Sequence, residues 1–347
     1  MIKRIQSLYI VLLSALLLAL TACSPLPGSS ASPVEGALEV HFLDVGQGDA
    51  ALLLCDGASM LIDGGNVADS SLVAAYLKAH EISRLDYIVC THGHEDHVGG
   101  LSGALNTATV NTVFSPVQNF DSKAFRDFVH YTKLQGNTIT IPAPGDRFSL
   151  GSAQVEVLAP LQDYEDTNNT SIVLKITHGS VSFLFTGDAE SLSEEDMIEA
   201  GLDLNATVLK VGHHGSNTST SYRFLREVLP EYAVISVGEG NSYGHPHEEV
   251  LSRLRDADVT LYRTDMQGHI IAISNGERVT FTTQRTAKAP TNPTEKAPTS
   301  YYIGNLRSLK VHLPTCTSLP AEQNQIRFDT LDEALKDGYS PCSACRP

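Results

Sequence analysis

The feature that most constrains this chain is a dense group of metal-binding side chains directly after a hydrophobic segment that ends at Cys90. Four side chains able to bind a metal ion fall within six residues: His92, His94, Asp96 and His97. In an extended segment, residues i and i+2 point to the same side, so His92 and His94 can bind one ion together. Asp96 and His97 are expected to begin a helix and to reach a second ion nearby. Imidazole and carboxylate ligands suit Zn²⁺, Mn²⁺ or Fe, so the segment predicts a centre of two metal ions.

Residues 38–283 around this segment predict one α/β domain. Short apolar or alternating segments typical of strands recur along it, with amphipathic segments typical of helices between them. The predicted strands are 38–43, 50–54, 60–62, 85–90, 154–158, 171–177, 182–186, 207–211, 232–237 and 270–274. The predicted helices are 70–80, 123–134, 194–200, 221–228 and 247–256. Runs of strands with helices interspersed indicate two sheets with helices outside.

The histidine cluster resembles the metallo-β-lactamase superfamily, whose signature is His-x-His-x-Asp-His. Other positions that match the family follow in the same order along the chain. The resemblance implies that Asp63 supports the metal loop and that Asp188 bridges the two metals. It also implies that one histidine of the pair His213–His214 is the last metal ligand. His213 is favoured and His214 is the alternative, because the sequence does not fix the register.

Two further segments resemble one branch of that superfamily, the extracellular hydrolase domain of the ComEC/Rec2 competence proteins. They are Phe-Leu-Asp-Val-Gly-Gln-Gly-Asp-Ala at 42–50 and Asn-Ser-Tyr-Gly-His-Pro-His at 241–247. The resemblance implies an αββα sandwich over residues 38–283 and a nuclease or phosphodiesterase activity. It does not extend to the channel-forming part of those proteins, so DNA transport is not implied.

The chain departs from the superfamily pattern at one position. Many members carry a further metal-binding histidine shortly before the strand that precedes the bridging aspartate, whereas residues 167–171 read Thr-Asn-Asn-Thr-Ser. The first metal would then have only His92, His94, Asp188 and water as ligands. We therefore expect this ion to be weakly bound or exchangeable, with Mn²⁺ as suitable as Zn²⁺.

Two close cations would lower the pKa of a shared water and stabilise the negative charge that develops on the substrate. Asp96 and Asp188 are the expected catalytic carboxylates, and His245 would bind a phosphate oxygen or protonate the leaving group. Alternatives stay open, because Asp49 can stabilise a turn, His245 can be a structural turn histidine and His247 can cap the next helix. The candidate substrate contacts are Asp49, His214 and His247.

Residues 1–23 have the pattern of a secretory signal: two basic residues, an apolar run and a small-residue exit. The ending Leu-Thr-Ala-Cys resembles a bacterial lipobox, which implies a lipid on Cys23. The polar residues 24–37 would form a flexible tether. We therefore expect a protein anchored in the cell membrane and facing outside the cytoplasm. The alternative is a plain signal peptide with a chance cysteine.

The charge balance weighs against a polyanionic partner. The formal net charge is −16, and loss of the two basic residues of the signal would leave −18. A strongly acidic protein repels nucleic acid at long range, unless metals and lysines reverse the field locally. The five cysteines after Cys23 are odd in number, which argues against a simple set of disulfides.

Residues 284–299 predict a linker, and residues 300–347 predict a small α+β module stapled by zinc. The spacing His-x₃-Cys and Cys-x₂-Cys suits one tetrahedral structural Zn²⁺, with a Cys342–Cys345 disulfide as the alternative. Segments 302–305, 328–334 and 338–342 resemble the zinc-binding domain of the Ada DNA-repair protein. That domain uses four cysteines, so the histidine here puts its methyl transfer in doubt. The expected zinc ligands are His312, Cys316, Cys342 and Cys345.

Three functions compete on this sequence. The first is an extracellular metal-dependent nuclease or phosphodiesterase with a nucleic-acid substrate. The second is a metallo-hydrolase of lactones, β-lactams or phosphocholine esters, which the acidic charge favours. The third is a non-catalytic DNA-binding protein, which only the missing histidine supports.

Overall fold

The computed structural model describes residues 36–289 and 301–342, except residues 315, 317 and 329. The predicted signal peptide with Cys23, the tether up to residue 35, the linker from residue 290 and Cys345 lie outside these ranges. We describe two regions by themselves: the two-sheet region, residues 36–289, and the C-terminal region, residues 301–342. The expected boundaries of independent domains stay a prediction.

The first sheet of the two-sheet region has eight strands in the order β15-β14-β1-β2-β3-β4-β5-β6. The strands from β3 to β6 run parallel, and the other neighbours are antiparallel. The strands are β1 (Leu38–Phe42), β2 (Ala51–Cys55), β3 (Ala58–Ile62), β4 (Arg84–Val89), β5 (Thr109–Phe114), β6 (Ile139–Thr140), β14 (Ile270–Ser274) and β15 (Val279–Thr283).

The second sheet has seven strands in the order β13-β12-β11-β10-β9-β8-β7. The strands from β10 to β13 run parallel, and the rest are antiparallel. The strands are β7 (Arg147–Leu150), β8 (Ala153–Ala159), β9 (Val173–His178), β10 (Val181–Phe185), β11 (Val208–Lys210), β12 (Tyr232–Ile235) and β13 (Thr260–Arg263).

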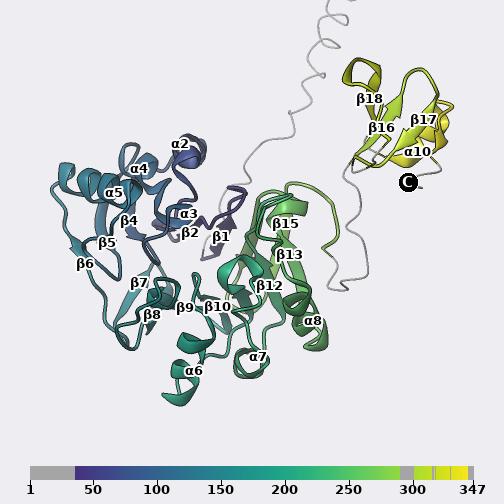
Figure 1. The fold of residues 1–347 in the computed structure, drawn as a ribbon. Helices are drawn as coiled ribbons and strands as arrows, with labels where there is room; N and C mark the ends of the chain where they lie inside the picture. Colours follow the sequence, from purple (N-terminus) through teal and green to yellow (C-terminus); the bar gives the residue numbers. More distant parts are fainter. Residues whose placement is uncertain (1–35, 290–300, 315, 317, 329, 343–347) are drawn as a thin grey trace, which may run out of the picture. The chain divides into compact units, whose positions relative to one another are not determined.

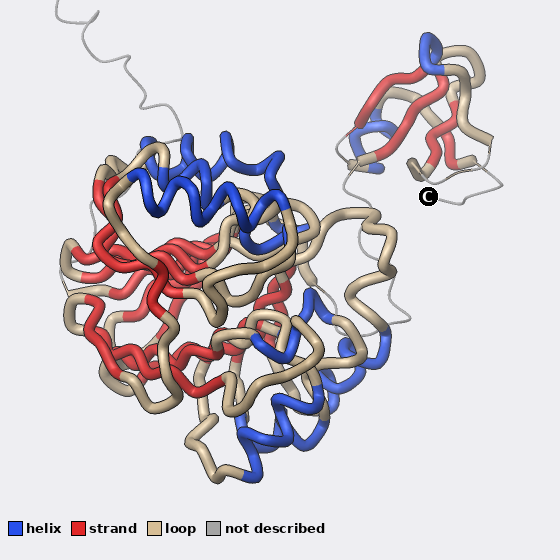
Figure 2. The backbone as a smooth tube through the Cα atoms, turned by 60° about the vertical axis from the view of Figure 1, so that its left-hand side comes forward, coloured by secondary structure: helices blue, strands red, loops and turns tan. Residues whose placement is uncertain are grey.

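Helices cover the outer face of each sheet, as Figures 1 and 2 show. On the first sheet they are α2 (Ser70–Ala79), α4 (Leu101–Leu105) and α5 (Lys123–Leu134). On the second sheet they are α6 (Ser191–Glu199), α7 (Tyr222–Val228) and α8 (Glu248–Asp256). The short helical turns are η1 (Val67–Asp69), α3 (Glu95–Val98), η2 (Asn168–Thr170), η3 (Gly212–Gly215) and α9 (Thr264–Gln267).

The alternation along β1 explains how the sheets pack. Leu38, Val40 and Phe42 point into the core between the two sheets, where the Phe42 and Phe185 rings stack at 5.6 Å. His41 points to the other face and contacts Tyr76 of α2. The result is an αββα sandwich, so the predicted fold class is confirmed.

The C-terminal region forms a four-stranded sheet in the order β18-β16-β17-β19, with one α-helix among its described residues. Its core is small and centres on Val311, Phe328, Ala334 and Tyr339. The elements are β16 (Tyr302–Asn305), β17 (Lys310–His312), η4 (Glu322–Asn324), β18 (Gln325–Phe328), α10 (Leu331–Lys336) and β19 (Ser340–Pro341). Nowhere in the described ranges is a helix both long and apolar enough to span a bilayer.

Candidate metal centre

The predicted site residues follow the carboxyl ends of parallel strands. Asp63 follows β3, His92 and His94 follow β4, and Asp188 follows β10. Parallel strands end at the same edge of a sheet, so turns after β3 and β4 meet, as do turns after β10, β11 and β12. The turns of the two sheets come together at one place, which the sequence order alone does not reveal.

Four buried side chains form the tightest group of potential ligands in the two-sheet region: Asp49, His97, Asp188 and His214 offer ligand atoms that all lie within 4.8 Å of one another. Nε2 of His97 lies 3.2 Å from Oδ1 of Asp188, and Nε2 of His214 lies 3.6 Å from its Oδ2. Asp96 reaches the same place, with Oδ2 3.3 Å from Nε2 of His214. Ligand atoms around one tetrahedral ion are about 3.4 Å apart, so these spacings fit a cation. We call Asp96, His97, Asp188 and His214 the second metal position.

Asp63 is fully buried beneath this position. Its Oδ1 accepts the Thr91 backbone N–H at 2.8 Å, and its Oδ2 accepts the Thr91 hydroxyl at 2.7 Å. The same Oδ2 lies 2.8 Å from Nδ1 of His97. A carboxylate on Nδ1 leaves Nε2 free as the ligand atom, so Asp63 lies where it can orient His97 for a metal.

His92 and His94 lie beside the second metal position. They lie in a bend before α3, not in the extended segment expected, yet their rings still converge because Nε2 of His92 is 3.0 Å from Nδ1 of His94. Nε2 of His92 also lies 3.8 Å from Oδ2 of Asp188. We call His92, His94 and Asp188 the first metal position, and Asp188 is shared by both.

The structure resolves the register of the histidine pair in η3. His214 is buried with Nε2 among the carboxylates, and its Nδ1 donates to the Ser236 carbonyl at 3.0 Å. His213 is partly exposed, and its Nδ1 lies 3.0 Å from Glu190. Both have left-handed backbones, with φ of 47° and 52°, a conformation that non-glycine residues adopt rarely and that clusters at functional sites. His214, the alternative, therefore lies in the buried ligand group, while Nε2 of the favoured His213 lies 3.7 Å from Oδ2 of Asp188 at the edge of that group.

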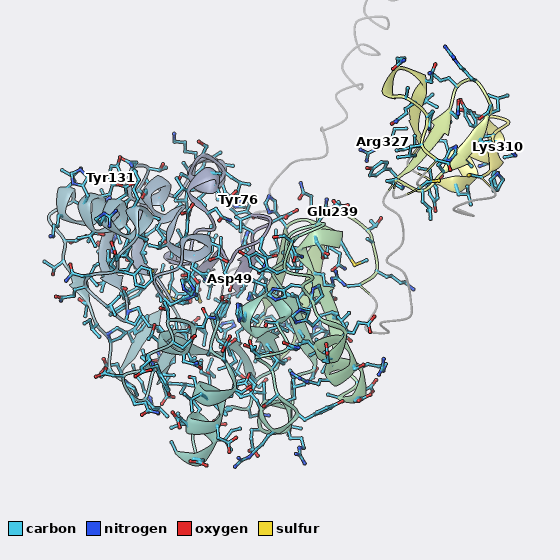
Figure 3. All side chains as sticks on the ribbon, viewed as in Figure 1. Asp49, Tyr76, Tyr131, Glu239, Lys310 and Arg327 are labelled. Atoms are coloured by element: carbon cyan, nitrogen blue, oxygen red, sulfur yellow. The ribbon has the colours of Figure 1, made fainter. Side chains whose placement is uncertain are left out.

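Asp49 has a different place from the expected substrate contact. It is buried in the interior of the two-sheet region (Figure 3), where its Oδ2 pairs with Nζ of the buried Lys210 at 2.8 Å. Its Oδ1 lies 3.2 Å from Nδ1 of His214. Burial raises the pKa of Asp49, but Lys210 and His214 outweigh it and lower the pKa overall. Asp49 thus lies behind His214 as a charged support.

A cavity of about 340 Å³ opens above the two metal positions. Its wall includes Tyr243 and His245 from the loop 238–247, whose rings stack at 5.7 Å. Gln47 lies opposite, with Nε2 3.5 Å from Nδ1 of His245. Burial, with help from His213, lowers the pKa of His245 to about 4, so its imidazole is neutral near pH 7. The residues that line the cavity are Gln47, His94, Glu95, Asp96, Asn168, Asp188, His213, His214, Tyr243 and His245.

His247 lies outside this lining. Its Nδ1 accepts the Asn217 backbone N–H at 2.9 Å, and its ring lies 4.8 Å from that of His245. It occupies the N-cap position of α8, but its side chain makes no capping hydrogen bond. The capping alternative is therefore wrong, and the expected substrate contact of His247 stays a prediction.

Unpartnered buried atoms show that the residues fit a metal. Asp49 Oδ1, His97 Nε2, Asp188 Oδ1 and His214 Nε2 are buried and form no hydrogen bond with any described residue. Buried polar atoms are rarely left without a partner, and a cation at the second metal position would satisfy those of His97, Asp188 and His214. The charges agree: burial lowers the pKa of His97, but Asp188, Asp63 and Asp96 outweigh it and raise the pKa well above its usual value. Carboxylates likewise raise the pKa of His214 to about 10 despite its burial, so bound cations would displace protons.

The C-terminal region holds a second group of potential ligands. Single ligand atoms of His312, Cys316 and Cys342 lie within 4.8 Å of one another, all three residues are buried, and Nδ1 of His312 is 3.4 Å from Sγ of Cys316. The described cysteines form no disulfide. These are three of the four expected zinc ligands.

Several residues that support the site were not predicted from the sequence. Lys210 is buried beside Asp49, and Glu190 lies behind His213. Ser171 Oγ accepts the Asp188 backbone N–H at 3.1 Å. A lysine within the apolar segment 207–211 was a usable signal for Lys210, because a buried lysine needs a carboxylate partner.

Comparisons with known proteins agree with this geometry. Residues 43–239 match the family described as the metallo-beta-lactamase superfamily, and residues 286–347 match the metal binding domain of Ada. The chain is 31% identical over 251 residues to ComE operon protein 3 of Bacillus subtilis, covering 67% of this chain and 32% of that protein. It is 33% identical over 236 residues to competence protein ComA of Neisseria gonorrhoeae, again covering 67% and 32%. The chain thus spans about a third of the length of these relatives.

A shorter match links the chain to a named phosphodiesterase. Over 114 residues it is 32% identical to zinc phosphodiesterase ELAC protein 1 of Bos taurus, covering 29% of this chain and 31% of that protein. The superfamily match covers more than half of the chain and includes β2 to β12, with every ligand of both metal positions. On this evidence the chain belongs to the metallo-β-lactamase superfamily of hydrolases and carries an Ada-type metal-binding domain at its C-terminal end.

Proposed function

We propose that this protein is a metal-dependent phosphodiesterase that cuts nucleic acid outside the cytoplasmic membrane. The observation that carries the proposal is the pair of ligand groups that meet on one carboxylate, Asp188. A site with two adjacent metal positions suits in-line displacement at phosphorus, because both the attacking and the leaving oxygen need stabilisation.

His92, His94 and Asp188 would hold the first cation, and Asp96, His97, Asp188 and His214 the second. When bound, such cations supply Lewis acidity and a nucleophilic water at neutral pH. Zn²⁺ and Mn²⁺ both accept this mixture of imidazole and carboxylate.

The chain's own residues would position the substrate. The neutral His245 can donate one ring N–H to a phosphate oxygen, while Gln47 at 3.5 Å orients the ring through Nδ1. Tyr243 is 66% exposed and stacks on His245 at the mouth of the cavity, where a nucleobase could stack on it in turn. These groups suit a ligand that combines a phosphate with a flat ring.

The printed names of the relatives support a nucleic-acid substrate. One is a ComE operon protein, the second is a competence protein and the third is a zinc phosphodiesterase. Because the chain spans only about a third of the first two, their other activities are not transferred here. The predicted lipid on Cys23 would anchor this hydrolase at the membrane surface.

The net charge of −16 favours a second candidate, a hydrolase of lactones, β-lactams or phosphocholine esters. Such small substrates are not repelled as a long polyanion is. The choice between the two candidates is therefore one of substrate, on the same metal site.

The decisive experiment compares Asp188→Ala with the matched surface variant Asp127→Ala, whose carboxylate lies on α5 beside an exposed lysine. Full-length protein in detergent is given single- and double-stranded DNA, RNA and an ester panel, with Mn²⁺ or Zn²⁺. We expect metal-dependent cutting of nucleic acid, at least about a hundredfold slower in Asp188→Ala and unchanged in Asp127→Ala. Equal cutting by Asp188→Ala would reject the mechanism. Turnover of esters with none of nucleic acid would select the second candidate.

A further inference from the structure

The first metal position lacks the third histidine of its family, and Asn168 lies in the segment 167–171 from which that histidine is missing. Asn168 begins the turn η2 within residues 167–171, and it lines the same cavity as His94 and Asp188. The residue is 9% exposed, so it is a buried polar residue in the wall of the site.

The orientation of the Asn168 amide follows from its neighbour. Nδ2 of Asn168 lies 3.3 Å from Oε1 of Glu190. An ionised carboxylate can only accept hydrogen bonds, so the amide nitrogen must face Glu190 and the amide oxygen must face away from it. Glu190 also lies 3.0 Å from Nδ1 of His213 and accepts the Thr218 hydroxyl, which fixes its own position.

The amide oxygen that results is without a partner. Oδ1 of Asn168 is buried and makes no hydrogen bond to any described residue. The adjacent Asn169 is a direct contrast, because its Oδ1 accepts the backbone N–H groups of Glu190 and Ser193 at 3.1 and 3.2 Å. The Asn169 amide oxygen thus caps α6, whereas the Asn168 amide oxygen remains an acceptor without a donor beside the site.

Most other buried side-chain atoms without a hydrogen-bond partner belong to residues of the two groups of potential metal ligands. Eight buried side-chain atoms of the described residues lack a hydrogen-bond partner. Five belong to the two groups of potential ligands: Asp49 Oδ1, His97 Nε2, Asp188 Oδ1, His214 Nε2 and His312 Nε2. Asn168 Oδ1 lies in the wall of the same cavity, and the other two atoms are serine hydroxyls.

We propose that Asn168 Oδ1 is the protein ligand that takes the place of the missing histidine at the first metal position, with Glu190 as the residue that positions it. The first position then has two imidazole nitrogens and two oxygens, from Asn168 and Asp188. Carbonyl and carboxylate oxygens are hard donors that suit Mn²⁺ better than a third imidazole would, whereas imidazole suits Zn²⁺. The position should therefore bind Mn²⁺ in competition with Zn²⁺ and exchange more readily than the second position.

The inference rests on the proposed two-metal site but not on its substrate, so metal binding tests it directly. Full-length protein is dialysed against buffers of fixed free Mn²⁺ or Zn²⁺, and bound metal is counted by mass spectrometry and titration calorimetry. The wild type should bind two ions in the two-sheet region and one in the C-terminal region. Asn168→Ala should lose one ion, or bind it about 10- to 100-fold more weakly, and keep the others.

Asn168→His supplies the imidazole that the family uses. It should raise the affinity of the same ion for Zn²⁺ relative to Mn²⁺ by at least about tenfold, and change the visible spectrum of the Co²⁺ form. Asn106→Ala, an exposed asparagine of the same region, is the matched control and should bind as wild type does. Thermal unfolding of each variant verifies that the fold is kept.

The possible outcomes separate this inference from the proposed function. Unchanged affinity for both ions in Asn168→Ala would overturn the inference and leave the two-metal site intact. Loss of the ion in His213→Ala, with Asn168→Ala unaffected, would also overturn it by assigning the ligand to His213. A wild-type protein with a single ion in the two-sheet region would overturn the two-metal proposal itself.

Discussion

The two groups of potential metal ligands in this chain differ in donors and in surroundings. The two-sheet region offers carboxylates and imidazoles at the bottom of an open cavity of about 340 Å³. The C-terminal region offers two cysteines and one histidine, all buried, which resembles a closed structural zinc site. The first arrangement leaves room for a substrate and the second does not.

The cores behind the two groups differ as well. Three large clusters of buried apolar side chains support the two-sheet region, whereas the C-terminal cluster has four buried members. A small core does not offset the entropy of an ordered chain by itself, so we expect the C-terminal region to need a metal ion to fold. The comparison suggests two uses of metal in one chain. In the two-sheet region the metal would serve the reaction and the fold would not depend on it, whereas in the C-terminal region the metal would stabilise the fold.

Removal of metal should have the largest effect on folding. The contrast between the two regions would be wrong if both regions unfolded, or neither did. Structural zinc contributes about 10–16 kcal/mol in zinc-finger peptides, far more than a core of four side chains can replace. We expect a chelator to unfold residues 301–342 and leave the two-sheet region folded. Hydrogen exchange with mass spectrometry, resolved by region, measures this. Protection of the C-terminal region that survives chelation would contradict it, and Cys316→Ser should reproduce the effect without a chelator.

The Lys210–Asp49 pair tests whether the site of the two-sheet region is held by protein contacts. Lys210→Met leaves the buried Asp49 carboxylate without its cationic partner, which should lower the free energy of unfolding by about 3–5 kcal/mol. Urea unfolding of metal-free protein measures it. The added change Asp49→Asn should restore part of the loss. Lys123→Ala, which breaks an exposed pair on α5, is the control and should cost less than about 1 kcal/mol.

Protonation of two histidines outside both groups of potential metal ligands should have the smallest effect. Burial and then His41 lower the pKa of His80, and burial lowers the pKa of His269 despite Asp44. The unfolded chain binds protons at these histidines near pH 6.5, whereas the folded chain does not, so stability is full above that pH and falls below it. Unfolding at pH 7.5 and 5.5 measures the slope. His80→Gln should flatten it, and an unchanged slope would exclude this histidine as its source.

The sequence predicted the architecture well where periodicity is strong. The helix expected at 123–134 has those bounds in α5, and the strand expected at 154–158 lies within β8. Strands β5, β6, β7, β13 and β15 were not predicted. They carry many exposed or partly exposed residues, so their apolar pattern is weak.

The site was predicted less completely than the fold. The ligand segment 92–97 could be predicted from the sequence, because its potential metal ligands are close together in the chain. The choice between His213 and His214 depends on two left-handed residues in succession, which no pattern of apolar residues encodes. The place of Asp49 depends on Lys210 and His214, which are distant in sequence and meet it only after both sheets have packed.

The loop 238–247 contributes the cavity wall through Tyr243 and His245 but none of the ligands at either metal position. The two ends of the loop pack closely against neighbouring backbone. A Cβ atom added to Gly238 would lie 2.7 Å from the Gln47 backbone nitrogen, and one added to Gly215 would lie 2.6 Å from Pro246, so neither glycine leaves room for a side chain. Selectivity and reactivity are therefore encoded in separate stretches of the gene. Randomising positions 239–243 while Gly238, His245 and Pro246 are kept offers a route to new substrate ranges on an unaltered reaction centre.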